Sequence, residues 1–111
     1  RMPTVFKNEV VTGVGKTPVD ILQIIAGVRA TIIGLNLANT SDYDMAVVNV
    51  YVIDESSTVA NYARQIPIPP GSSAKVITNG ERLILPETAG LRLECDTDDC
   101  IDASISYVEI S

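Results

Sequence analysis

The sequence predicts an all-β fold, an antiparallel two-sheet β-sandwich of jelly-roll-like type with eight or nine short strands. Two patterns lead to this fold class. Apolar and polar residues alternate in short runs closed by turn residues, and no stretch keeps a convincing helical period. With 111 residues, 46% of them hydrophobic and 20% charged, the chain is long enough for one core. We therefore expect a single β-sandwich domain over residues 1–111.

Each strand is expected to end where the alternation meets a turn. The predicted ranges are 4–12, 18–25, 28–39, 45–54, 60–67, 73–78, 81–85, 90–95 and 101–110. The run MAVVNVYVID, residues 45–54, has the clearest pattern because valines occupy every second position. It predicts that Val48, Val50 and Val52 face the core, whereas Asn49 and Tyr51 face away from it.

The predicted connections carry residues typical of turns. They include Gly13 with Gly15, Ala26-Gly27, Ser41-Asp42, Pro69-Pro70-Gly71, Asn79-Gly80 and the segment 87–90. Asn79-Gly80, between KVIT and ERLIL, is the strongest of these signals and predicts a β-hairpin of the strands on either side.

The charge pattern argues against nucleic acid as a partner, and the pattern of apolar residues argues against a membrane as a partner. Fourteen acidic residues against eight basic ones give a net charge of −6, and the basic residues are scattered from Arg1 to Arg92. The longest apolar stretch, residues 21–35, is interrupted by Gln23 and Arg29 and is too short to span a bilayer. The first residues show no secretory signal, so we expect that one is absent or was removed before this numbering begins.

The residue types do not provide a catalytic set. The chain has no histidine, which excludes Ser–His and Cys–His nucleophiles and histidine metal ligands. The acidic residues cluster in predicted loop tips, where exposure to water gives carboxyl groups no reason to become catalytic. The stretch VTGVGKTP, residues 11–18, lacks a phosphate-binding loop's first glycine, since Val10 holds that position. We predict no enzymatic activity, no catalytic or cofactor-binding residue and no cofactor.

The acidic stretch LECDTDDCI, residues 93–101, raises the question of a metal site. Two cysteines without histidine cannot supply the four ligands of a structural zinc site. The aspartates are suitable calcium donors, but the run lacks the central glycine and terminal glutamate of a known calcium loop. No metal ligand is predicted, and the aspartates are interpreted as a solvated loop tip.

Both cysteines, Cys95 and Cys100, lie in this stretch, which is interpreted as the tip of a hairpin. Pairing Cys95 with Cys100 would put Leu93 beside Asp102, which places an apolar and a charged side chain on the same face of the sheet. If Leu93 is instead opposite Ala103, both strands keep their apolar residues inward. This register favours two thiols, with Cys95 in the core and Cys100 in the turn. A bulge would allow an internal disulfide, and pairing of Cys100 with another chain stays open too.

Four segments, 7–15, 28–54, 66–74 and 81–111, carry a resemblance to a known family. They contain, in order, KN…VV…G, TIIGLNLANTS with VNVYVID, IPIPPGSS, and ERLILPETAGLRLE followed by DASISYVEIS. With these segments the chain resembles the small β-sandwich virion structural proteins of tailed bacteriophages. Similar chains usually read PVPAG and LVLEAGD where this chain has IPIPPG and LPETAG, and the cysteines are not part of the pattern.

The resemblance implies a phage virion structural protein, foremost a capsid decoration or cement protein that binds the head lattice through protein–protein contacts. A neck or tail component is the alternative within the same class. The implied partners are the major capsid protein or other virion proteins, together with further copies of the chain in a homo-oligomer, for which capsid symmetry suggests a trimer. The implied location is the virion, assembled in the cytoplasm of the host bacterium.

The N-terminal segment is the predicted interface. Its apolar and basic residues suit an arm that adds to the sheet of a neighbour; they are Arg1, Met2, Pro3, Thr4, Val5, Phe6 and Lys7. A different class of function is a small carbohydrate- or receptor-binding module, since sandwich domains commonly bind glycans. Such a module requires exposed aromatic side chains, for which Tyr43 and Tyr62 are the candidates.

Overall fold

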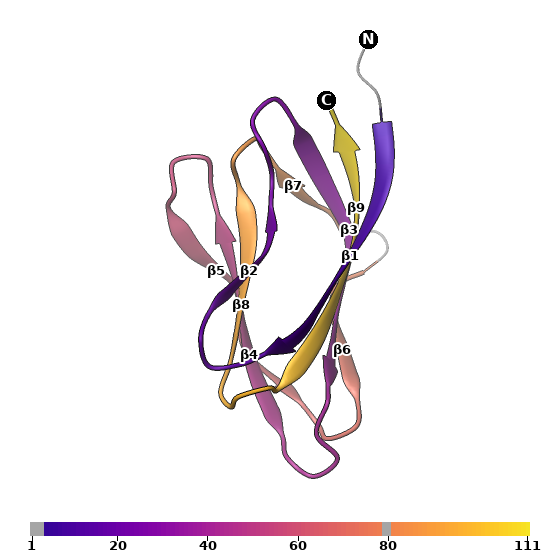
Figure 1. The fold of residues 1–111 in the computed structure, drawn as a ribbon, viewed down its shortest axis with the longest axis vertical. Coiled ribbons are helices and arrows are strands. Elements are labelled where there is room, and N and C mark those ends of the chain that lie inside the picture. Colours follow the sequence, from indigo (N-terminus) through magenta and orange to yellow (C-terminus); the bar gives the residue numbers. More distant parts are fainter. Residues whose placement is uncertain (1–3, 79–80) are drawn as a thin grey trace.

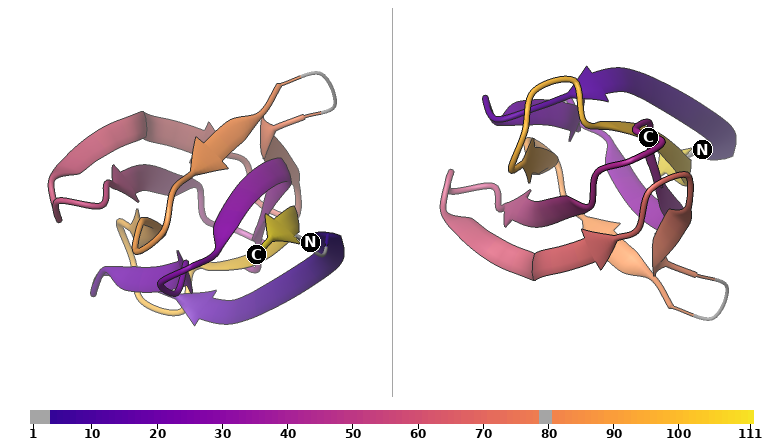
Figure 2. Two further views of the ribbon diagram at one scale, coloured as in Figure 1. Left: turned by 90° about the horizontal axis from the view of Figure 1, so that it is seen from above. Right: turned by 90° about the horizontal axis from the view of Figure 1, so that it is seen from below.

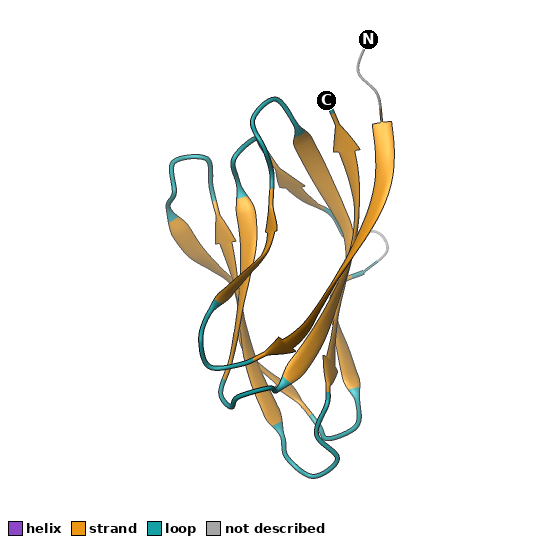
Figure 3. Ribbon diagram, viewed as in Figure 1, coloured by secondary structure: helices purple, strands orange, loops and turns teal. Residues whose placement is uncertain are grey.

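The computed structural model describes residues 4–78 and 81–111 of the chain. Within this part the chain forms nine strands joined by turns and loops (Figure 3). The strands are β1 (Thr4–Val14), β2 (Val19–Gln23), β3 (Arg29–Asn39), β4 (Ala46–Ile53), β5 (Val59–Ile68), β6 (Ser73–Ile77), β7 (Leu83–Leu85), β8 (Gly90–Cys95) and β9 (Ile101–Ile110). The structure therefore confirms the all-β class and the approximate place of every predicted strand.

The strands form two antiparallel sheets that pack face to face (Figures 1 and 2). One sheet has the order β1-β9-β3-β6, with β7 also pairing with β3, and the other has the order β2-β8-β4-β5. These orders are those of a jelly roll, in which the chain crosses repeatedly between the sheets; among the described strands only β4–β5 and β6–β7 are consecutive strands of one sheet. The fold class is thus a two-sheet sandwich with jelly-roll connectivity, as the sequence predicts.

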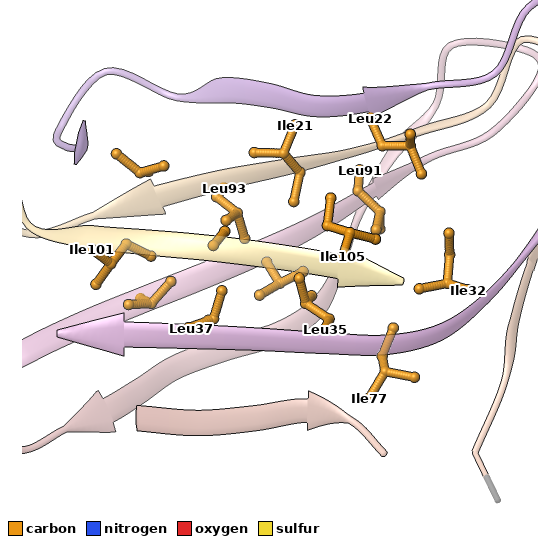
Figure 4. Packing of buried hydrophobic residues seen from close by; sticks show 14 of the residues in the cluster. Ile21, Leu22, Ile32, Leu35, Leu37, Ile77, Leu91, Leu93, Ile101 and Ile105 are labelled. Carbon is orange, nitrogen blue, oxygen red and sulfur yellow. The ribbon is translucent and has the colours of Figure 1, made fainter. Parts of the chain in front are cut away.

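The core lies between the sheets and is built from alternate residues of the central strands. On β4, Val48 and Val50 are fully buried and Val52 packs against the core, as the alternation predicts. Figure 4 shows Leu91 and Leu93 of β8 close to Ile105 of β9, across the interface of the two sheets. The alternate apolar residues of β8 and β9, which the sequence places inward, are all buried: Leu91, Leu93, Cys95, Ile101, Ala103, Ile105 and Tyr107. No helix of the described residues has the length and apolarity to cross a membrane.

The two strands on either side of Asn79-Gly80 do not form the predicted hairpin. The turn residues themselves lie outside the described residues. The strand before them, β6, pairs with Leu35–Ala38 of β3, and the strand after them, β7, pairs with Ala30–Ile32 of the same strand. The two strands therefore follow one another along one edge of β3. The prediction was wrong because a two-residue turn signal reports local backbone geometry and not the partner of each strand.

The interpretation of residues 93–101 as a hairpin was also wrong. The strand before the loop, β8, pairs with β2 and β4, whereas the strand after it, β9, pairs with β1 and β3 in the other sheet. The argument from side-chain parity required β8 and β9 to be neighbours in one sheet, so it does not apply to this crossover.

Cys95 and Cys100 form a disulfide across the loop between the sheets, with their Cα atoms 6.4 Å apart. This corrects the expectation of two thiols. Cys95 is buried as predicted, but Cys100 is buried too and does not lie exposed in the turn. Both cysteines belong to the core cluster, where the chain passes from one sheet to the other.

Candidate functional site

The edge strand β1 is the most exposed strand of the fold. It pairs with β9 on one side, and no strand of the described chain pairs with it on the other. Every residue from Thr4 to Val10 is exposed. Three apolar side chains stand out in this stretch: Val5 is 45% exposed, Phe6 77% and Val10 66%. An unpaired sheet edge with apolar side chains is a ready surface for another chain.

The two faces of β1 differ in what they contact. Residues opposite each other on antiparallel strands point to the same side of a sheet. Lys7 lies opposite the buried Tyr107, so the odd-numbered residues from Val5 to Val11 are on the core side. The even-numbered residues from Thr4 to Val10 are on the outer face. Phe6 and Val10 therefore lie together on the outer face of the sheet, two positions to either side of Asn8.

Polar side chains occupy the core side of the exposed half of β1. Lys7 forms an ion pair with Glu109, at 2.9 Å, and the Tyr107 hydroxyl donates a hydrogen bond of 3.4 Å to Glu9. The hydrogen bond and charge of Glu109 raise the pKa of the Lys7 ammonium group. Burial raises the pKa of the Tyr107 hydroxyl, and the charge of Glu9 raises it further.

A cleft opens beside these polar groups, between the edge strands of the two sheets. Its volume is about 410 Å³, and its walls include Lys7, Glu9 and Tyr107 on one side and Asp20 and Leu22 of β2 on the other. The exposed half of β1 therefore covers little of the core. It is held in place by its pairing with β9 rather than by packing.

Strand β1 ends at an irregularity between Val11 and Val14, where the register with β9 shifts. Gly13 adopts a positive φ of 67° here, a backbone conformation that favours glycine. Its N–H donates a hydrogen bond of 3.0 Å to Asp102 Oδ1. The regular part of the edge is thus limited to Thr4–Val11.

The aspartates of the β8–β9 loop are not gathered into an oxygen-donor site. Asp96 Oδ1 accepts a hydrogen bond from the backbone N–H of Val47, and Asp102 stabilises Gly13 as described above. Among the described residues, the one group with converging metal-binding atoms is Cys95, Asp96 and Cys100, and its two sulfur atoms form the disulfide. The side chains of Asp96 and Asp102 thus stabilise the backbone around this loop.

The loop between β3 and β4 exposes an aromatic side chain and is held by several hydrogen bonds. The buried Asn39 donates hydrogen bonds of 2.8 Å to the carbonyl of Asp44 and 2.9 Å to that of Ile68. Ser41 Oγ accepts from the N–H groups of Tyr43 and Asp44. Tyr43 is 90% exposed at this loop.

The two aromatic residues considered for glycan binding are not brought together. Tyr62 is partly buried on β5 and packs against the core. It lies beside Ala63, which is opposite Val50, whereas Tyr43 precedes Ala46 at the start of β4. The fold therefore does not build the aromatic patch that this alternative requires from the two tyrosines.

The structure places the predicted interface residues as follows. Arg1, Met2 and Pro3 lie outside the described residues. Thr4–Lys7 belong to β1 and pair with Tyr107–Ile110 of the same chain. The prediction did not include Asn8, Glu9 and Val10, which continue the same exposed edge. The signal was present in the alternation of this segment, but only the sheet order shows that the strand is an edge.

The fold and the exposed edge define this chain as a jelly-roll sandwich whose edge strand β1 has one open side with exposed apolar side chains. A scan against protein-family models finds no matching family, and a search of curated proteins finds no match. Two solved structures are similar over 99% of the chain.

The first comes from Bacillus endospore appendages, described as a family of disulfide-linked pili. It has a TM-score of 0.55 and 12% identity, and the match covers 88% of that protein. The second is a chain of the T13 viral particle of IBDV, with a TM-score of 0.56 and 11% identity. The match covers 30% of that chain, so this protein spans less than a third of it. At such identities the likeness is one of fold.

Proposed function

We propose that this chain is a structural subunit of a virus particle, and specifically a decoration or cement protein on the capsid of a tailed bacteriophage. The observation that carries the proposal is the exposed apolar edge of β1, because an all-β subunit acts mainly through its surfaces and edges. Similarity in fold to a pilus protein and to a viral-particle protein supports a role in an assembly. The sequence resemblance described above supports the tailed phages and the capsid. The neck or tail is the alternative place on the particle.

The proposed partners are the major capsid protein or other virion proteins and further copies of this chain. The proposed interface is the N-terminal segment, residues 1–7, acting on the sheet of a neighbour. Thr4–Lys7 suit this role because they present exposed side chains on a strand with an open edge. The protein would then reside in the virion, after assembly in the bacterial cytoplasm.

Electron microscopy of particles assembled with and without this protein tests the proposed function. We expect particles without it to lose density distributed over the capsid lattice and to break at lower mechanical or thermal stress. Loss of density at one vertex or along the tail would contradict decoration and move the protein to the neck or tail. Unchanged particles would contradict a virion role, and binding of the isolated protein to a glycan array would then be measured.

Deleting residues 1–7 is expected to abolish binding to particles while the rest of the sandwich still folds. The described part of this segment contributes no buried side chain, whereas the core residue Val14 at the end of β1 is retained. The measurement is the copy number on purified particles, with circular dichroism as the check on folding. A matched control is Ile84→Ser, which changes a 69% exposed side chain on the opposite edge of the sheet. Unchanged occupancy of the deletion variant would contradict the proposed arm.

A further inference from the structure

The edges of the two sheets differ in how easily another strand could join them. On the β6–β7 side the edge is divided between two short strands. The edge strand β5 contains Pro67 and pairs irregularly with β4, and β2 is short and has a register shift after Asp20. Such features protect sheet edges from other chains. In contrast, β1 pairs without interruption from Thr4 to Val11, so among the described edges it is the long and regular one.

The sequence of this edge is self-complementary about Asn8. It reads TVFKNEVVT over residues 4–12, and residues at equal distance from Asn8 match in chemical type. The matched pairs are Thr4 with Thr12, Val5 with Val11, Phe6 with Val10, and Lys7 with Glu9. Three pairs are alike in polarity, and the fourth is opposite in charge. A strand that pairs antiparallel with a copy of itself brings such residues face to face.

We propose that two copies of this chain pair through their β1 strands, antiparallel, about a two-fold axis that passes at Asn8. The sheets that contain β1, β9 and β3 then continue from one copy into the other, and the neighbour whose sheet the N-terminal segment joins is a second copy of this chain. Each residue lies opposite the matched residue of the second copy, and every pair occurs twice because the interface is isologous.

The two faces of the paired sheet agree with this register. Matched residues are both odd-numbered or both even-numbered, so core-side residues meet core-side residues. On the outer face Phe6 lies opposite Val10 of the second copy, which covers the two most exposed large apolar side chains of the strand. On the core side Lys7 lies opposite Glu9 of the second copy, next to its own ion pair with Glu109. Cross-strand pairs of opposite charge or of aromatic and β-branched residues stabilise sheets.

Neighbouring registers are less favourable. A two-fold axis at Lys7 puts each lysine opposite its own copy and each Phe6 opposite Asn8. An axis at Glu9 puts the two glutamates opposite each other. Like charges directly opposite destabilise a sheet, and a shift by a single residue would place core-side residues on the outer face. The charges of Lys7 and Glu9 thus select the axis at Asn8.

Site-directed cross-linking tests the position of the axis. In the proposed register Asn8→Cys places the new thiol opposite itself, within disulfide reach. We expect this variant of the full chain to form a covalent dimer under air oxidation. The matched control Val10→Cys is exposed as well, but its two copies would be displaced by four residues, about 13 Å. Cross-linking of Lys7→Cys in preference to Asn8→Cys would overturn the register.

Charge reversal tests the pairing without new cysteines. The wild-type chain is expected to dimerise across a concentration series in analytical ultracentrifugation. Lys7→Glu alone or Glu9→Lys alone should raise the dimer dissociation constant by roughly tenfold or more, because two attractive pairs become repulsive. The double variant with both changes should recover dimerisation. The double variant still lacks the native ion pair of Lys7 with Glu109. If its dimerisation recovers, the weaker dimers of the single variants are due to the pairing between copies and not to damage to the fold.

A wild-type chain that stays monomeric throughout the series would overturn the proposal, and so would a double variant that is as weak as the single ones. The experiment uses the isolated protein, whereas the proposed function is measured on particles. If the isolated chain is a monomer, the proposed role on the particle is still tested by electron microscopy. If particles do not change when the protein is absent, the proposed dimer is not affected by that result.

Discussion

Replacing Leu93 by alanine is expected to lower the free energy of unfolding by about 2–5 kcal/mol. Leu93 is fully buried on β8, where it lies opposite Val19 of β2 and Val50 of β4. Its side chain reaches the region of Ile101 and Ile105 in the other sheet (Figure 4). Removing it therefore loses contacts within one sheet and between the two sheets, and the regular strands around it limit collapse into the cavity.

Denaturant unfolding followed by far-ultraviolet circular dichroism measures this loss. The matched control is Ile25→Ala, because Ile25 is 68% exposed in the loop after β2. We expect that substitution to change the free energy of unfolding by no more than about 0.5 kcal/mol. A loss below about 1 kcal/mol for Leu93→Ala would mean that the packing between the sheets differs from the one described.

Reducing the disulfide between Cys95 and Cys100 is expected to lower the free energy of unfolding by about 2 kcal/mol. The bond closes a loop with a sequence separation of 5, and a short loop gains less from cross-linking than a long one. Both cysteines are buried where the chain crosses from one sheet to the other. Reduction therefore frees the crossover in the unfolded chain and loosens the two sheets at one end.

Unfolding curves with and without dithiothreitol measure the contribution of the disulfide. The double variant Cys95→Ala, Cys100→Ala serves as the control, since its stability should not respond to the reductant. Protein isolated without reductant should show no reactive thiol after unfolding in denaturant. Two reactive thiols in that sample would contradict the disulfide and restore the interpretation from the sequence.

The proposed interface at the N-terminal strand depends partly on the sequence and partly on the tertiary structure. The mixture of apolar and basic residues in 1–7 pointed to this end of the chain as a contact surface. The symmetric positions of Lys7 and Glu9 about Asn8 are also visible in the sequence. They can pair two copies only if the strand lies at an open edge of a sheet. The sheet order, with β1 outside β9, supplies that condition. Many exposed strands contain a lysine and a glutamate, and their spacing matters only where another strand can lie alongside.

Alternation along the chain determined where the strands lie and which residues face the core. It succeeded for residues 45–54 and 101–107 because a strand exposes successive side chains to opposite faces, which is a local property. Only the tertiary structure decided which strands are neighbours: β8 and β9 enter different sheets, and β6 and β7 share one partner. Apart from β4 and β5, the strands that pair here are not consecutive in sequence, so their pairing depends on burying two sheets against each other. This arrangement of strands brings Cys95 and Cys100 together in a disulfide and leaves β1 at an open edge.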